Sequence, residues 1–235
     1  QPRQRGPGAS TGCSGVELEC LHLGGNRIHS VAALGLAGLV RLKQLYLHDN
    51  DIQRLNGFNN LPALRELSLN NNRIKYLDAK AFLELTSLKA IYLEENGLKS
   101  LSHIDTLKCV QRLHIGCNRL TETADLDRLA ELPELTELVA NNNPIARKQA
   151  YKSLILKNCP HLVLLDSKEI TPEEREQSDM LFATGETPAA SAQPGLQNGV
   201  SKVPIKLTSM NFEHLLAYQA GAGVVMPLGD GLGVR

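Results

Sequence analysis

Apolar residues recur along this chain in a pattern that is repeated six times. Each copy has leucine or another apolar residue at its first, fourth, sixth and eleventh positions, and asparagine at its ninth position. The copies begin at Leu18, Leu42, Leu64, Leu88, Val110 and Leu135, which are 22 to 25 residues apart, and Leu162 begins a seventh, incomplete copy. A period of this length indicates stacked structural units rather than one closed core.

The middle of each copy predicts a short β-strand whose apolar residues face inward, because alternate strand residues point to opposite sides. One unit cannot bury its apolar face alone, whereas a stack of units forms a continuous core. We therefore predict an α/β fold, a leucine-rich-repeat solenoid. It should be a right-handed arc with a parallel sheet on the concave side and short helical or 3₁₀ turns on the convex side. The strands should begin near Glu19, Lys43, Arg65, Lys89, Gln111 and Thr136. The longer units, such as the one containing residues 79–85, have room for a fuller helical turn.

The asparagine of each copy follows the strand, where the chain turns inward. Buried backbone donors and acceptors at such a turn need partners, and an asparagine amide offers both a donor and an acceptor. Six asparagines are therefore expected to form a structural ladder: Asn26, Asn50, Asn72, Asn96, Asn118 and Asn143. If these asparagines were ordinary surface turn residues, the regularly spaced leucines around each of them would have no explanation.

Composition changes along the chain predict four segments. Residues 1–15 are expected to be disordered, and residues 16–176 form the repeat domain with a C-terminal cap at about 143–176. Residues 177–201 are rich in small and polar residues, which predicts a flexible linker. Residues 202–235 form a tail, mostly disordered or the start of a truncated further segment. The chain begins with Gln1 instead of Met, so a piece of a longer product is one interpretation.

Two helices are predicted in the cap. Residues 146–157 have the spacing of an amphipathic helix, and Thr171, Pro172 and Glu174 form a typical helix start. The stretch from Asn143 through Tyr151 to Asp166 resembles the cap of intracellular leucine-rich-repeat proteins of the phosphatase-1 regulatory-subunit type. A spliceosomal subunit and several ciliary, dynein-associated proteins share this cap. The resemblance implies the fold, whereas these relatives bind very different partners.

The register assigns a central row on the concave face to His22, Tyr46, Ser68, Tyr92, His114 and Val139. Tyrosine offers a large contact area and a hydroxyl group, which binding surfaces favour. Ser68 is expected to leave a shallow dip between two tyrosines, in which a partner side chain could sit. The candidate partner-binding residues are Tyr46, His48, Ser68, Asn70, Tyr92, Glu94, Arg112 and His114. The alternative interpretation is that these strand positions are simply solvated.

Composition argues against several other functions. Lysine and arginine total 25, as do aspartate and glutamate, so the balance gives no reason to expect direct nucleic-acid or membrane binding. No apolar run is long enough to span a membrane, and the N-terminus does not resemble a secretory signal. The five cysteines are scattered and odd in number, which favours a reducing compartment over a disulfide framework. We expect no metal and no cofactor.

Catalysis is also not expected. Cys20 and His114 lie on the same predicted face but four repeats apart, and the pair of Cys117 with His114 lacks a third orienting residue. The sequence contains no phosphate-binding loop or zinc-protease motif. We therefore predict a non-enzymatic, monomeric protein-binding scaffold in the cytoplasm. The resemblance of the cap implies a phosphatase-regulatory or cilium- and dynein-associated role. The alternative is a structural component of a nuclear ribonucleoprotein assembly that makes protein-to-protein contacts.

Overall fold

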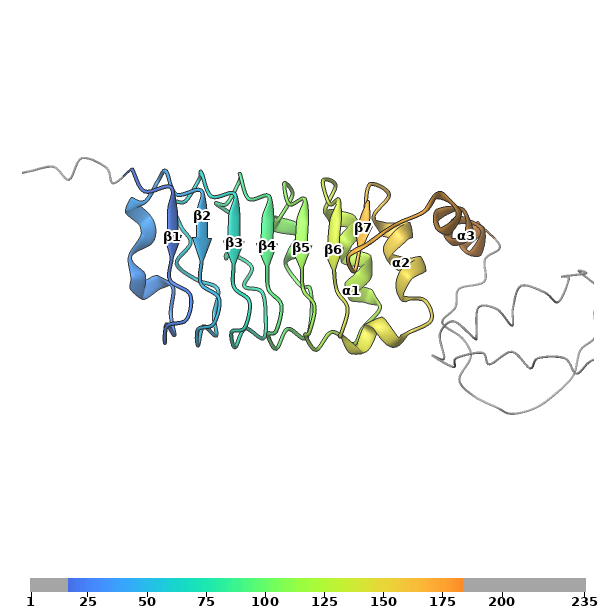
Figure 1. Cartoon of the computed structure of the whole chain (residues 1–235), viewed down its shortest axis with the longest axis horizontal. Coiled ribbons are helices and arrows are strands. Elements are labelled where there is room, and N and C mark those ends of the chain that lie inside the picture. Colours follow the sequence, from blue (N-terminus) through green and yellow to red (C-terminus); the bar gives the residue numbers. More distant parts are fainter. Residues whose placement is uncertain (1–16, 184–235) are drawn as a thin grey trace, which may run out of the picture. The chain divides into compact units, whose positions relative to one another are not determined.

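The computed structural model describes residues 17–183, so the predictions for residues 1–15 and 202–235 lie outside the described residues. Short strands lie side by side in sequence order along this part of the chain (Figure 1). Seven of them are parallel: β1 (Cys20–His22), β2 (Gln44–Tyr46), β3 (Glu66–Ser68), β4 (Ala90–Tyr92), β5 (Arg112–His114), β6 (Glu137–Val139) and β7 (Leu164–Leu165). Strands β1 to β6 each begin one residue after the predicted position, which confirms the leucine-rich-repeat fold class.

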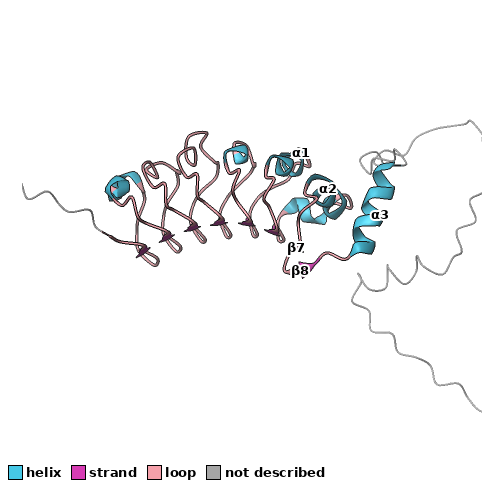
Figure 2. Ribbon diagram, turned by 90° about the horizontal axis from the view of Figure 1, so that it is seen from above, coloured by secondary structure: helices cyan, strands magenta, loops and turns pink. Residues whose placement is uncertain are grey.

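The sheet lines one side of the arc and the helical segments lie on the other side (Figure 2). These convex segments are η1 (Ala32–Leu34), η2 (Leu36–Gly38), η3 (Ile104–Thr106), α1 (Ala124–Asp127), η4 (Arg128–Glu131) and η5 (Pro144–Arg147). The fuller helical turn expected within residues 79–85 is absent. There the amide of Ala81 donates to Asp78 and that of Leu85 donates to Phe82, so the segment forms separate turns. The leucines between the two sides form one continuous buried cluster.

The asparagines after the strands make a regular hydrogen-bond network. The Nδ2 atom of Asn72 donates to the carbonyl oxygens of Leu47, Leu69 and Asn70 at 2.9, 3.0 and 3.1 Å. Its Oδ1 atom accepts from the amide of Ile52 at 3.0 Å. The same four bonds recur in each of the other internal repeats, at Asn50, Asn96, Asn118 and Asn143. One side chain thus pairs the backbone groups of two neighbouring repeats.

Asn26 differs from the other five asparagines. Its Nδ2 atom donates to Leu23 and Gly24, but the residue is exposed. No strand of the described residues lies on the outer side of β1, so no neighbouring repeat there donates to its Oδ1 atom. The network therefore has its full form in the internal repeats and half of that form at the first repeat.

The cap departs from the predicted single helix over residues 146–157. The 3₁₀ segment η5 stops because Lys148 adopts an extended conformation, with φ −76° and ψ 136°, and α2 spans Tyr151–Asn158. The chain then forms β7, a two-residue turn and β8 (Lys168–Glu169), which pairs with β7 in the antiparallel direction. Asp166 and Ser167 in this turn have positive φ values of 51° and 66°. Such values are uncommon for residues other than glycine, which is why the sequence did not indicate the hairpin.

The last helix, α3 (Pro172–Ala183), begins where predicted but ends later. The Thr171 hydroxyl accepts from the amide of Glu174 and the Glu174 carboxylate accepts from the amide of Thr171, both at 3.3 Å. The helix continues beyond residue 176 into the segment predicted to be a linker. Ser178 is buried there and donates to the carbonyl of Ser153 at 3.1 Å. The polar residues of α3 therefore pack against α2, and the cap extends to at least Ala183.

Candidate functional site

The sheet register brings the predicted central row together on the concave face. His22, Tyr46, Ser68, Tyr92 and His114 are direct neighbours across successive strands, followed by Val139. Each of these residues occupies the last position of its strand, between two inward-facing apolar residues. The repeat pattern fixes which residues reach this face, whereas the residue types on it vary from strand to strand.

Tyr46 is held in place by residues of both neighbouring strands. The His22 ring stacks on it with a centroid distance of 4.3 Å and an interplanar angle of 9°. Its hydroxyl donates to Oε1 of Glu66 at 3.2 Å, and Gln44 donates to the other oxygen of Glu66 at 3.2 Å. Partial burial, with a further contribution from the Glu66 carboxylate, raises the pKa of Tyr46. The phenol is therefore a neutral donor with a fixed orientation.

Tyr92 lies two strands away and meets an imidazole ring edge-on. The centroids of the Tyr92 and His114 rings are 4.8 Å apart with an interplanar angle of 83°. Nε2 of His114 lies 2.9 Å from Oε1 of Glu137, and Nδ1 lies 3.9 Å from Oε2 of Glu94. Burial raises the pKa of Tyr92, as it does for Tyr46. The histidine thus links two carboxylates and supports the aromatic ring.

Ser68 does not form the open dip that the sequence predicted. It is only 7% exposed, and Ala90 on the next strand is fully buried. The two tyrosines are the direct register neighbours of Ser68, and their large side chains flank it on both sides. Ser68 therefore offers no open dip, and the partly exposed side chains of the two tyrosines form this part of the concave surface.

The row nearer the turns is ordered by side-chain hydrogen bonds. Asn70 donates to Oε2 of Glu94 at 3.3 Å and accepts from the amide of Glu94 at 2.9 Å. Nδ1 of His48 lies 2.7 Å from Oδ2 of Asp49. The His48 ring lies against Gly24, where a Cβ atom would approach Cε1 of His48 to 2.4 Å. Gly24 therefore provides the space for His48.

Arg112 is the exposed cation of this face. It is the register neighbour of Ala90 and Glu137, and among the described residues no ion pair is recorded for it. Three carboxylates, those of Glu66, Glu94 and Glu137, lie next to the side chains of the aromatic row. Tyr46, Tyr92 and His114 thus share the face with Arg112, while Ser68 lies beneath the surface.

Several residues of the face were not among the candidates chosen from the sequence. His22 occupies the same row as the tyrosines, so its position alone could have included it. The contacts of Glu66 and Glu137 follow from strand register, since each lies one strand away from the aromatic residue that it supports. Within residues 17–183, no group of histidine, cysteine or acidic residues has a geometry suited to a metal ion. No helix in this range is long and apolar enough to cross a membrane.

Comparison with known proteins supports the fold and relates the chain to two groups of proteins. The family model described as "Leucine-rich repeat" matches residues 12–117 and 105–193. U2 small nuclear ribonucleoprotein A' of Aspergillus fumigatus is 36% identical over 87 residues, which cover 36% of this chain and 34% of that protein. Cilia- and flagella-associated protein 410 of Mus musculus is 33% identical over 107 residues, or 43% of this chain and 42% of that protein. The chain thus spans about a third to two fifths of the length of these relatives.

A similar solved structure is that of the Drosophila melanogaster SNF/U2A' complex. The matching chain has a TM-score of 0.49 and 27% sequence identity, over 69% of this chain and 80% of that chain. The leucine-rich-repeat domain of APL1B also has a TM-score of 0.49, with 26% identity over 54% of this chain and 39% of that chain.

Proposed function

The chain belongs to the leucine-rich-repeat family, and we propose that it is a non-enzymatic adaptor that holds a partner protein on its concave face. The observation that carries this proposal is the pair of supported tyrosines, Tyr46 and Tyr92, on one row of the sheet. A binding surface whose side chains are already fixed loses little conformational entropy when a partner arrives. Stacking on His22 and a hydrogen bond to Glu66 fix Tyr46, and the edge-on contact with His114 supports Tyr92.

The two tyrosines are spaced for contact with one partner element. They lie two strands apart, which corresponds to about 10 Å at the usual separation of strands. Buried aromatic anchors supply much of the affinity in protein interfaces. His48, Glu94 and Arg112 are expected to form a polar rim that fixes the orientation of the partner. Since Glu66, Glu94 and Glu137 surround the rings, we infer that the contacting surface of the partner combines apolar groups with positive charge.

The cellular setting proposed for the adaptor is the cytoplasm, at the cilium or the cytoskeleton. The similarity to cilia- and flagella-associated protein 410 supports this setting. A phosphatase-regulatory role is a further proposal, which rests on the resemblance of the cap between Asn143 and Asp166. We propose that the protein acts as a monomer and needs no cofactor. It is not expected to bind nucleic acid or membranes directly.

The test is affinity capture with the full chain from extracts of ciliated cells. The wild-type chain is compared with the Tyr46→Ala/Tyr92→Ala variant, and Leu83→Ala serves as a control because Leu83 is an exposed apolar residue outside the sheet. The proposal predicts at least one protein that the wild type and the control retain and the double variant loses. If all three chains retain the same proteins in equal amounts, the concave face is not the binding surface.

A second candidate function is a structural role in a nuclear ribonucleoprotein assembly. The similarity to U2 small nuclear ribonucleoprotein A' supports this alternative. It predicts that the full chain accumulates in the nucleus and co-precipitates small nuclear ribonucleoprotein components through the tyrosine face. Ciliary localisation together with failure to precipitate those components would exclude it in favour of the first setting.

A further inference from the structure

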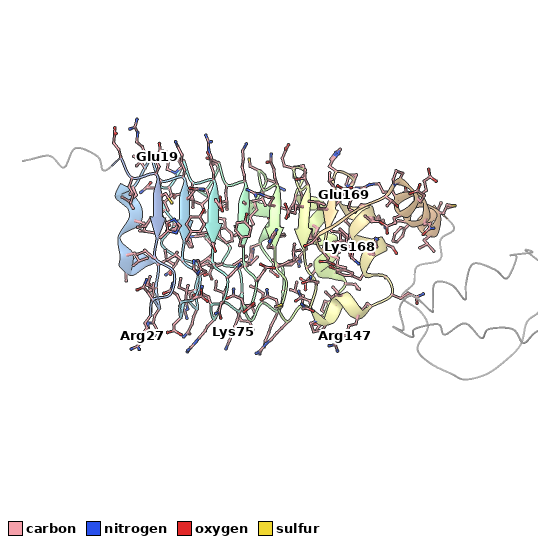
Figure 3. The ribbon with its side chains drawn as sticks, in the orientation of Figure 1. Glu19, Arg27, Lys75, Arg147, Lys168 and Glu169 are labelled. Atoms are coloured by element: carbon pink, nitrogen blue, oxygen red, sulfur yellow. The ribbon has the colours of Figure 1, made fainter. Side chains whose placement is uncertain are left out.

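A second surface with different chemistry lies at the edge of the sheet where the strands end. Six basic residues follow the ladder asparagines of successive repeats there, and we call them the basic edge: Arg27, Arg54, Arg73, Lys75, Lys99 and Arg119. All six are exposed. Arg27 and Lys75 lie on this edge, opposite the edge that carries Glu19 (Figure 3).

Backbone hydrogen bonds hold the segments of the basic edge side by side. The amide of Arg73 donates to Ile52 at 2.9 Å, that of Arg119 donates to Leu98 at 2.8 Å, and that of Lys99 donates to Lys75 at 3.3 Å. The two lysines are thus direct neighbours in adjacent repeats. Like charges that face each other across paired segments are destabilising. Such an arrangement is stabilised when an anionic group lies between them.

The charges of the basic edge are mostly unpaired within the described residues. Arg73 forms an ion pair with Asp51 at 2.7 Å, whereas no ion pair is recorded there for the other five. Asp78, which lies beside Arg54, Arg73 and Lys75, accepts a hydrogen bond from the amide of Leu55 at 3.2 Å. Arg73 and Arg119 are separated by Gly97, where a Cβ atom would have ordinary contacts of 3.5 Å. Packing therefore does not require the glycine, and its absent side chain leaves the backbone open between two arginines.

One exposed aromatic residue lies within this edge. Tyr76 is 59% exposed and lines a hollow of about 290 Å³ together with Gln53, Arg54, Arg73, Lys75 and Asp78. The hollow therefore combines three cations with an aromatic side chain. This combination suits a carboxylate next to an apolar side chain, because arginine binds carboxylates through paired donors and tyrosine supplies apolar contact.

We propose that the basic edge binds a short acidic protein segment and that it does so independently of the concave face. A protein segment fits better than nucleic acid because Asp51 and Asp78 lie among the cations and interrupt the continuous positive field that a phosphate backbone requires. The chain as a whole is also neutral, with 25 basic and 25 acidic residues. An acidic peptide can place its carboxylates beside the cations and its apolar residue against Tyr76.

The test uses fluorescence anisotropy with the full chain and a labelled, glutamate-rich peptide that contains one leucine. Lys75→Glu/Lys99→Glu reverses two neighbouring charges of the basic edge. Its matched control is Arg65→Glu/Lys89→Glu, which reverses two exposed neighbours on the opposite edge, where the amide of Lys89 donates to Arg65. Lys75→Gln/Lys99→Gln removes the charges without reversing them, in case the reversal prevents folding. Circular dichroism melting checks that each variant is folded.

The proposal predicts that reversal at the basic edge weakens peptide binding at least tenfold and that Tyr76→Ala weakens it several-fold. The opposite-edge control and Tyr46→Ala/Tyr92→Ala should stay within about twofold of the wild type. Binding should also weaken with added salt, because exposed charges are screened. An equal loss in both edge variants, or no loss in either, would overturn the proposal. Tighter binding of a labelled uridine-rich RNA of equal length, lost in the same variant, would overturn it in favour of nucleic acid.

Discussion

The asparagine network and the aromatic row both run across the repeats, with one residue from each, but the residues in them follow opposite rules. Each internal ladder asparagine makes the same four hydrogen bonds and lies between repeats that match one another. Along the aromatic row every residue differs from its neighbour, and each contact is particular, such as the stacking of His22 on Tyr46. Residues that are repeated hold the repeats together, whereas residues that vary distinguish this surface from those of other solenoids.

This difference predicts that substitutions of the repeated leucines and asparagines lower the stability of the fold, whereas substitutions of the variable residues on the concave face weaken binding. The largest effect on stability is expected for Leu93→Ala, because Leu93 is fully buried in the centre of the array. The free energy of unfolding should fall by about 2–5 kcal/mol, as for other buried leucines. Urea denaturation measures this change, with Leu83→Ala as the exposed control. A change below about 0.5 kcal/mol, which is typical of surface sites, would place Leu93 outside the core.

The ladder itself is tested by comparing Asn72→Ala with Asn26→Ala. Asn72 is 8% exposed and makes four hydrogen bonds, whereas Asn26 is exposed and makes two. Loss of the Asn72 amide leaves buried backbone groups unpaired, which should cost about 2–3 kcal/mol of unfolding free energy. The Asn26 variant should lose less than about 1 kcal/mol. Equal losses in the same denaturation experiment would mean that the end of the array is as constrained as its centre.

Stability should decrease at alkaline pH because the buried Cys159 thiol and, to a smaller extent, the phenols of Tyr46 and Tyr92 have raised pKa values. Burial raises the pKa of the Cys159 thiol from its ordinary 9.0 to about 12. The folded chain then holds this proton at a pH where the unfolded chain has lost it. Its contribution to stability is therefore complete below pH 9 and is lost as pH rises towards 12. Denaturation midpoints of the wild type and Cys159→Ala across this range should differ in slope, and parallel curves would contradict the assignment.

The smallest effect concerns Tyr46 alone. Burial is the largest cause of its raised pKa and the Glu66 carboxylate is the next, so Glu66→Gln should lower the pKa of Tyr46 only part of the way to its usual value. Because Glu66 also contributes to the raised pKa of Tyr92, ultraviolet titration of the tyrosinates is compared for Glu66→Gln and the unaltered carboxylate in a Tyr92→Phe background. A full return to the usual value would show that the carboxylate, and not burial, governs this phenol.

The strands and the residues on the concave face were predictable from the sequence, because the leucines and the asparagine of each repeat define its register. The spacing of the leucines around Tyr46 and Tyr92 is sufficient to place both rings on one row. The burial of Ser68 was not predictable in this way, because it depends on the side chains of both neighbouring strands. The hairpin at Asp166 and Ser167 requires positive φ values at residues that usually avoid them. The length of α3 was missed because its residues are mostly polar and its packing contact is a buried serine.

The candidate site was predictable in position and not in detail. The sequence placed His114 on the concave face, but its contact with Glu137 depends on the register between β5 and β6. The basic edge was overlooked because its residues lie outside the strands, in the segments that follow the asparagines. Lys75 and Lys99 become neighbours only when the repeats stack. The pattern of a single repeat thus predicts which residues are exposed, whereas the contacts between neighbouring repeats determine which of these residues meet.

The most direct test of the account is the dissociation constant of the Tyr46→Ala/Tyr92→Ala chain for the purified partner recovered by capture. Loss of a hot-spot aromatic typically costs 2 kcal/mol or more, which is about a thirtyfold weakening for each ring. The account predicts at least a thirtyfold weaker complex from a variant that still unfolds cooperatively in urea, as the wild type does. An unchanged dissociation constant would contradict the claim that the variable residues of the concave face hold the partner.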